Sequence, residues 1–176
     1  MKLDYPIRQL GQIFTQLRVQ DLHHFEQETW RQKKFRSHEK TQCIFLRHWK
    51  NRNMDTIELQ DYPLISVYRE TLEGILYELS KYYDFKDYTA IITNLRAGAS
   101  IPKHTDNGKI FGLGHRIHIP IKTNSQVIFH CGDQSINMKL DYAYEIGNTS
   151  HIHAVDNNSG EDRYHLILDL FPNMVI

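Results

Sequence analysis

A histidine and an aspartate two positions apart, His104 and Asp106, are the first residues of this chain whose types and spacing could do chemistry. Side chains at positions i and i+2 of an extended chain point to the same side. An imidazole beside a carboxylate supplies two of the three ligands of the 2-His-1-carboxylate triad, which holds Fe(II) and leaves coordination positions open. Because a three-residue pattern also arises by chance, this assignment needs a third ligand from elsewhere in the chain.

Three later segments with the periodicity of β-strands carry histidine and arginine on one face and apolar residues on the other. They are 116–121, 151–155 and 163–170. Ordinary alternation, with the polar face in water, is one interpretation. The other is that the polar faces line a site in the mouth of a barrel, while helices cover the apolar faces from outside. This second interpretation requires four side chains to converge on one cavity: Arg116, His118, His153 and Arg163.

The elements that would position these residues begin with helices in the first half of the chain. Pro63 starts the clearest helix, in which apolar residues recur at i, i+3 and i+4 through about Tyr83. Gly74 inside this helix indicates close packing against a neighbour. A second helix is expected from about Asp21 to Arg36, and a short strand is expected over residues 43–46.

After Asp87 the apolar pattern changes to a period of two, interrupted by turn residues such as glycine and asparagine. The expected strands are 88–95, 116–121, 126–130, 136–140, 142–146, 151–155 and 164–171. Short strands at this spacing favour a sandwich or jelly roll. We therefore expect a single domain over residues 1–176, α+β but mainly β, with helical support over about 1–87 and a jelly-roll core over about 88–171.

Composition argues against several classes of function. The chain has 176 residues, which suit one domain, and its formal net charge is zero, so bulk electrostatics give no indication of nucleic-acid binding. No apolar run approaches the ~20 residues of a membrane span, and the N-terminus lacks the apolar core of a signal peptide. Cys43 and Cys131 lie in apolar, strand-like runs. We expect buried thiols there, which favours a cytoplasmic location.

A polar segment with three cations, 47–55, is expected to be a loop. A solvated surface loop is the ordinary interpretation of such a segment. In the alternative interpretation, the loop grips an anionic substrate through Arg47, Lys50 or Arg52.

Three stretches of sequence, IPKHTD, RIHIPI and HAVDNNSGEDRYHLILDL, resemble the aspartyl/asparaginyl β-hydroxylase family of Fe(II)- and 2-oxoglutarate-dependent oxygenases. They occur in the family's order and cover roughly residues 88–171. The resemblance implies a double-stranded β-helix, a cupin-like jelly roll whose mouth holds iron. It also implies hydroxylation of an unactivated C–H of an amino-acid side chain, similar to Asp, Asn or Pro and either free or in a peptide, with molecular oxygen consumed and succinate and carbon dioxide formed.

The resemblance assigns the iron ligands to His104, Asp106 and His153. Some members of the family lack the carboxylate; this chain keeps it and therefore resembles a member with the full triad. Arg163, ten residues after His153, resembles the arginine that pairs with the distal carboxylate of 2-oxoglutarate. The planar fork of a guanidinium matches a carboxylate in shape and charge.

Three further residues are assigned to the cosubstrate in the same way. Arg116 and His118 resemble the pair that contacts its metal-chelating end, and Thr93 falls where the family has a serine that also touches it. Elementary electrostatics agree with a bound dianion, since inward-facing arginines in a chain without net charge need compensation.

Two functions from other classes remain open at this point. A non-catalytic cupin-type module could use the same histidines and aspartate to hold a metal, but it would not require Arg163 at this spacing. A zinc hydrolase could use the same ligands, but no general base is evident.

Overall fold

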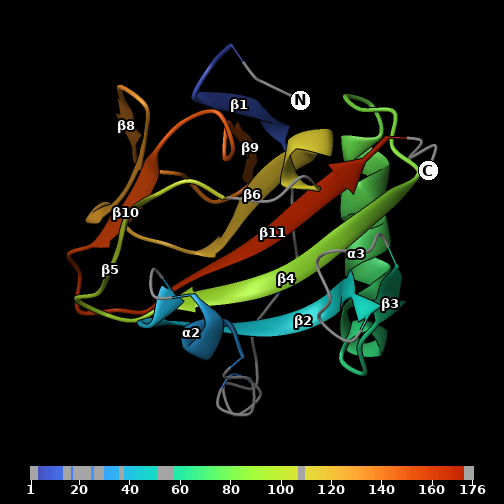
Figure 1. Cartoon of the computed structure of the whole chain (residues 1–176), viewed down its shortest axis with the longest axis horizontal. Helices are drawn as coiled ribbons and strands as arrows, with labels where there is room; N and C mark the ends of the chain where they lie inside the picture. The colour runs from blue at the N-terminus through green and yellow to red at the C-terminus, as the bar shows by residue number, and fades with distance from the viewer. Residues whose placement is uncertain are drawn as a thin grey trace.

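Two antiparallel β-sheets make up most of the computed structural model (Figure 1). The larger sheet has seven strands, in spatial order β1 (Ile7–Gln12), β9 (Tyr142–Ile146), β6 (His115–Lys122), β11 (Arg163–Phe171), β4 (Asp87–Leu95), β2 (Thr41–Trp49) and β3 (Leu59–Asp61). The smaller has four, β5 (Ser100–His104), β10 (His153–Asn157), β7 (Val127–Cys131) and β8 (Gln134–Ile136). The structure describes residues 4–13, 17, 25, 30–35, 38–50, 58–106 and 110–172. This architecture confirms the expected class, a mainly β jelly roll.

Strand β11, in the middle of the larger sheet, shows why the two faces of that sheet differ. Every one of its residues is buried. Its even-numbered residues from Tyr164 to Leu170 are tyrosine and leucines in the main apolar cluster. Arg163 and Ile167, in odd-numbered positions, line a pocket on the opposite face. Because side chains alternate along a strand, one sequence supplies an apolar core on one side and a polar site on the other.

Helix α3 (Ile65–Leu79) covers the outer, apolar face of the larger sheet (Figure 1). Its buried residues join the cluster formed by β2, β4, β6 and β11: Ile65, Tyr68, Leu72, Ile75 and Leu79. No side chain caps its N-terminus, so packing of this face is what stabilises the helix. Each buried Leu or Ile contributes about 1.5–3 kcal/mol relative to an exposed one. The contact between this helix and the sheet confirms the prediction that a helix covers the apolar face of these strands from outside.

A second apolar cluster fills the space between the sheets at one end of the molecule. It includes Leu95, Ile101, Phe129, Tyr144 and Val155, from five different strands of both sheets. This cluster holds the smaller sheet against the larger one, which leaves the polar inner faces of β6 and β11 facing β5 and β10. Cys131 lies in this cluster, and Cys43 lies in another; both are buried, as expected, and neither forms a disulfide.

Several boundaries differ from those that the sequence predicts. The first part of the chain supplies β1, β2 and β3 to the larger sheet and is not only a helical support. The strand expected over 136–140 is wrong, because β8 ends at Ile136. There the side-chain amide of Asn137 donates to the backbone carbonyls of Asn124 and Val127, which turns the chain away from the sheet. Gly74 is exposed, and beyond its own turn of the helix no atom of the described residues lies within 4 Å of the position of an added Cβ, so the close packing expected there is also wrong.

The helix expected over residues 21–36 falls largely outside the described residues, and the structure shows only α2 (Trp30–Lys34) from it. Phe25 packs on the outer face, where its ring lies 5.5 Å from that of Tyr164. Arg31, on α2, lines the pocket between the sheets instead. Among the helices that the structure describes, none is both long and apolar enough to cross a membrane.

Candidate metal centre

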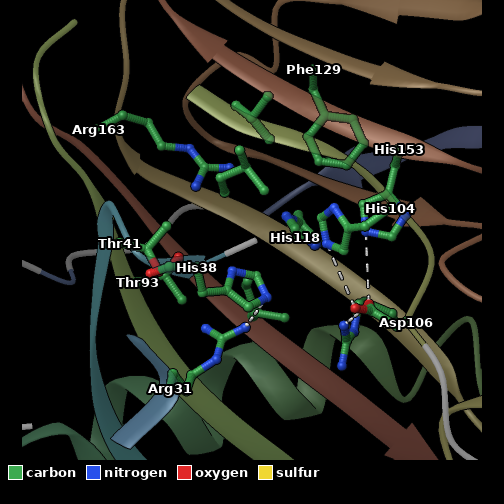
Figure 2. Close-up of a pocket in the computed structure, with 14 residues that line it drawn as sticks. Arg31, His38, Thr41, Thr93, His104, Asp106, His118, Phe129, His153 and Arg163 are labelled. Atoms are coloured by element: carbon green, nitrogen blue, oxygen red, sulfur yellow. Dashed lines mark hydrogen bonds and ion pairs between the residues drawn. The ribbon is translucent and has the colours of Figure 1, made fainter. Parts of the chain in front are cut away.

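Two neighbouring strands of the smaller sheet bring the two predicted histidine ligands together. His104 is the last residue of β5, His153 is the first residue of β10, and the two are paired in register. Their ring centroids are 4.3 Å apart. Asp106 follows β5 by two residues, and its backbone N–H donates to the carbonyl of Asn148. Figure 2 shows the three side chains gathered on one side of the pocket.

Both histidines lie close to the same carboxylate, that of Asp106. Nε2 of His104 lies 3.8 Å from Oδ1 of Asp106, and Nε2 of His153 lies 3.8 Å from Oδ2 of the same carboxylate. Ligand atoms bound to one ion at about 2.1 Å lie roughly 3–3.5 Å from each other. Both histidine–carboxylate distances are longer than this, so the three side chains would have to move closer together to share one ion.

Both histidines have the tautomer that a metal ligand needs. Nδ1 of His104 lies 2.8 Å from the carbonyl oxygen of Pro102, and Nδ1 of His153 lies 3.3 Å from that of His151. A carbonyl oxygen only accepts, so each Nδ1 carries the proton and each Nε2 keeps its lone pair. A backbone carbonyl on the second ring nitrogen is the usual support of a metal-ligating imidazole.

Electrostatics hold His153 and Asp106 in the charge states that a cation requires. Burial, the largest effect, lowers the pKa of His153 to about 4, so its imidazole is neutral near pH 7. Burial raises the pKa of the Asp106 carboxyl, but the Arg116 guanidinium, His153 and His104 together outweigh it and hold that pKa well below its usual range. The site therefore offers the ionised carboxylate of Asp106 and the neutral imidazole of His153, which are suitable ligands for a divalent transition metal.

Arg116 is compensated by two carboxylates of the chain itself. Its Nε and Nη2 donate to the two oxygens of Asp169, at 2.7 and 2.8 Å, and its Nη1 forms an ion pair with Asp106. Thr89 donates a further hydrogen bond to Asp169. Asp169 and Arg116 lie opposite each other in the register of β11 and β6. The guanidinium therefore has carboxylate partners before any cosubstrate binds.

Arg163 has no such compensation. The residue is 2% exposed, and its Nη2 donates to Nδ1 of His165 at 2.8 Å, a neutral partner. Its Nε is buried without a hydrogen-bond partner, and no acidic side chain pairs with it in the part of the chain that the structure describes. Burial lowers the pKa of this guanidinium to about 9. Because an unpaired buried charge is costly, the position favours an anionic ligand.

The same pocket contains the other residues that the sequence assigned to the cosubstrate. Thr93 and His118 line it together with Arg163 and the three candidate ligands. Nδ1 of His118 is buried without a partner among the described residues. The pocket thus brings together Arg116, His118, His153 and Arg163, which the second interpretation of the strand pattern required.

Two residues that line this pocket, His38 and Arg31, were not predicted from the sequence. Side-chain atoms of His38, His104 and Asp106 all lie within 4.8 Å of one another. Nε2 of His38 lies 3.1 Å from Nη2 of Arg31. Burial first, and Arg31 second, lower the pKa of His38 to about 2. Arg31 lies in the helix expected from about Asp21 to Arg36, and His38 follows it, but neither residue belongs to a recognisable motif, so the sequence gives no indication that they reach the pocket.

The cations of segment 47–55 do not reach the pocket where the structure describes them. Arg47 is part of β2 and not of a loop, and its guanidinium pairs with Asp61 and Asp87. Lys50 pairs with Glu58 at the surface, and Arg52 lies outside the described residues. Neither Arg47 nor Lys50 lines the pocket. The loop prediction is wrong for residues 47–49, because the strand continues through them to pair with β3.

Fold and site together define a jelly-roll protein with a candidate metal centre and a buried arginine, Arg163, in one pocket. A family model described as aspartyl/asparaginyl beta-hydroxylase matches residues 11–172, and the chain belongs to this family. No curated protein matches the sequence significantly.

Solved structures with similar folds are distant in sequence. An oxidoreductase of the 2OG-Fe(II) oxygenase family from Burkholderia pseudomallei has a TM-score of 0.53 at 10% identity, over 76% of this chain and 71% of that one. The Cnp3 cupin domain of Schizosaccharomyces pombe has a TM-score of 0.39 at 13% identity, over 49% of this chain and 60% of that one. At 10% identity, the likeness to the Burkholderia pseudomallei structure shows the fold alone.

Proposed function

We propose that this chain is an Fe(II)- and 2-oxoglutarate-dependent dioxygenase that hydroxylates an unactivated C–H of an amino-acid side chain, similar to Asp, Asn or Pro and free or peptidyl. The observation that carries the proposal is Arg163, a buried cation with no acidic partner among the described residues. It lines the same pocket as a carboxylate and two imidazoles with free Nε2 lone pairs. A divalent cation and a dicarboxylate match these two halves of the pocket.

In this proposal His104, Asp106 and His153 hold Fe(II), and Arg163 receives the distal carboxylate of 2-oxoglutarate. Thr93 and His118, on the same wall, hold the cosubstrate in place through hydrogen bonds. Apolar side chains of the wall, such as Phe129 and Ile167, keep water away from the metal side.

The contacts of Arg116 favour a role different from the one that the family resemblance gave it. Its guanidinium already has Asp169 and Asp106 as partners. We propose that Arg116 keeps Asp106 ionised and correctly placed, and that Asp169 anchors Arg116. A bidentate pair fixes orientation as well as charge.

When bound, Fe(II) and 2-oxoglutarate supply the oxidative chemistry: the cosubstrate is decarboxylated to succinate and one oxygen atom is left on the substrate. The chain itself binds both partners, excludes water and orients the reacting C–H. A cupin-type metal module without oxygen chemistry would leave the buried charge of Arg163 unexplained.

The test is turnover in air with Fe(II), ascorbate and 2-oxoglutarate, read by succinate formation and by mass spectrometry of added amino acids and short peptides. We expect iron-dependent succinate formation that rises with one of the added compounds, which gains one oxygen atom. Protein treated with a chelator and the His153→Ala variant serve as controls and should form none. Wild-type protein that binds iron but neither binds 2-oxoglutarate nor forms succinate would contradict the proposal.

A further inference from the structure

The pocket contains one cation for which neither the described residues nor the proposed cofactors provide an anion. Arg116 is paired with Asp106 and Asp169. In the proposed function, 2-oxoglutarate brings two negative charges, which Arg163 and the iron receive. Arg31 on α2 remains, and its only recorded polar partner in the described part of the chain is the neutral His38.

His38 is placed to support Arg31 and not to bind the metal. A guanidinium only donates, so Nε2 of His38 accepts from Nη2 of Arg31 at 3.1 Å. The neutral ring then carries its proton on Nδ1, and neither nitrogen offers a lone pair to an ion. His38 is 9% exposed, and its Nδ1 has no hydrogen-bond partner among the described residues. The pair therefore presents donors from both residues and no acceptor.

The position of this pair is next to the metal side of the pocket. The ring of His38 lies 5.4 Å from that of His104, in an edge-to-face arrangement. In Figure 2, Arg31 and Arg163 enter the pocket from different sides, and His38 lies between Arg31 and the group formed by His104 and Asp106. A ligand held by Arg31 would thus lie beside the metal and apart from the partner of Arg163.

We propose that Arg31, positioned by His38, binds a carboxylate of the primary substrate. The substrate would then be an amino acid with a free carboxylate, or a peptide with a free carboxylate at the reacting residue. The proposal rests on the proposed function and narrows it, because peptides whose reacting residue is flanked by amide bonds and carries no carboxylate would lack this contact. Donors without acceptors in a partly buried pocket select a carboxylate over its neutral amide.

The test measures binding, so that it does not depend on turnover. Protein loaded with Fe(II) and 2-oxoglutarate without oxygen is titrated calorimetrically with a panel of the common L-amino acids and with the matching primary amides, prolinamide and asparaginamide among them. We expect at least one amino acid to bind wild-type protein at least ~10-fold more tightly than its amide, as loss of one charge-assisted hydrogen bond predicts. A free amino acid and its N-acylated form are then compared, to separate an α-carboxylate of a single amino acid from one at the end of a peptide.

The decisive variant is Arg31→Gln, with Lys33→Gln, an exposed residue of the same helix, as the matched control. Arg31→Gln should reduce binding of the carboxylate to that of the amide and leave 2-oxoglutarate affinity unchanged, whereas Lys33→Gln should change neither. His38→Gln should weaken amino-acid binding and leave iron affinity unchanged.

Three results would overturn this proposal. They are wild-type affinity for amino acids in Arg31→Gln, equal binding of acids and amides, and no amino-acid binding by protein that does bind 2-oxoglutarate. Failure of the proposed function is a different result, because 2-oxoglutarate itself would then not bind.

Discussion

The two faces of the larger sheet each bury a cluster of charged and polar side chains, and the clusters differ in how complete they are. On the outer face, the fully buried Glu145 accepts hydrogen bonds from Tyr5 and from Tyr83, the latter at 2.9 Å, and pairs with His115. On the inner face, Arg163 has only neutral His165 as a partner, and its Nε has none among the described residues.

This difference distinguishes a structural network from a binding site. A buried network that is complete on its own ties together the elements that contribute to it: here the N-terminal segment, the end of α3, β6 and β9. A cluster that keeps a buried charge unpaired lowers the stability of the free protein, and it persists where a ligand completes it. Substitutions should therefore have opposite effects on the two faces.

The largest expected effect is on the metal. His153→Ala removes one of the two imidazoles, and we expect Fe(II) affinity to fall by more than about 100-fold, with succinate formation lost. Iron binding without oxygen, measured by calorimetry, checks the first part. His130→Ala is the matched control, since His130 lies in the adjacent strand of the same sheet and pairs with Ser135 and Asp156. Equal iron affinity in wild type and His153→Ala would remove His153 from the ligand set.

The next largest effect separates binding from stability on the inner face. Arg163→Met keeps the length of the side chain and removes its unpaired charge. We expect 2-oxoglutarate affinity to fall by about 2–5 kcal/mol, as for truncation of one partner of a buried charge pair. The free protein should unfold at the same or a higher urea concentration than wild type. A large loss of stability in the free protein would show that Arg163 has a structural anion partner, contrary to the comparison.

The outer face should respond in the opposite way. Glu145→Gln leaves its donors facing an amide, and we expect the free energy of unfolding to fall by about 2–3 kcal/mol at pH 7, with 2-oxoglutarate affinity unchanged. Equilibrium urea denaturation measures the first quantity and calorimetry the second. A stable variant with impaired cosubstrate binding would mean that the two faces are not separate.

The pH dependence of the stability of Glu145→Gln tests whether the carboxylate of Glu145 stabilises the outer face. Burial raises the pKa of Glu145, but hydrogen bonds from His115 and the tyrosines outweigh it, and the net pKa is lowered. A carboxyl with a lowered pKa in the folded state stabilises the protein above its ordinary pKa of about 4.3 and loses that contribution as the pH falls below it. The difference in stability between wild type and Glu145→Gln should therefore shrink from pH 5 downwards.

The smallest effect calibrates the stability measurements at a position away from both clusters. Gly74→Ala adds a methyl group on an exposed turn of α3, where it meets no described residue within 4 Å beyond its own turn of the helix. We expect a gain of about 1 kcal/mol, since alanine has the higher helix propensity. Urea denaturation should show this gain with no change in ligand binding. A loss of stability would indicate a contact on that side of α3.

Much of the site was predictable because a period of two fixes which residues share a face. The alternation in β6 and β11 places Arg116 and Arg163 on the inner side, and the expected strands there agree closely with those observed. The pairing of His104 with His153 needed only the two strands that carry them to be neighbours.

Register and non-periodic segments account for what the sequence could not provide. That Arg116 meets Asp169 depends on how β6 and β11 are aligned, which neither strand encodes alone. Arg31 lies in a helix that the sequence predicts and His38 follows it, but neither residue belongs to a motif that would place it in the pocket. Arg47 lies in a polar segment whose composition is typical of a loop, but the residue is part of a strand. Its charge is compensated there by Asp61 and Asp87 at the surface.

The most direct test of the account is a crystal grown without oxygen in the presence of Fe(II) and 2-oxoglutarate, measured on both sides of the iron absorption edge. We predict a single anomalous peak bonded to Nε2 of His104, the carboxylate of Asp106 and Nε2 of His153, with the distal carboxylate of 2-oxoglutarate on Arg163. Iron bound through His38 in place of His153, iron absent from this pocket, or 2-oxoglutarate away from Arg163 would contradict it.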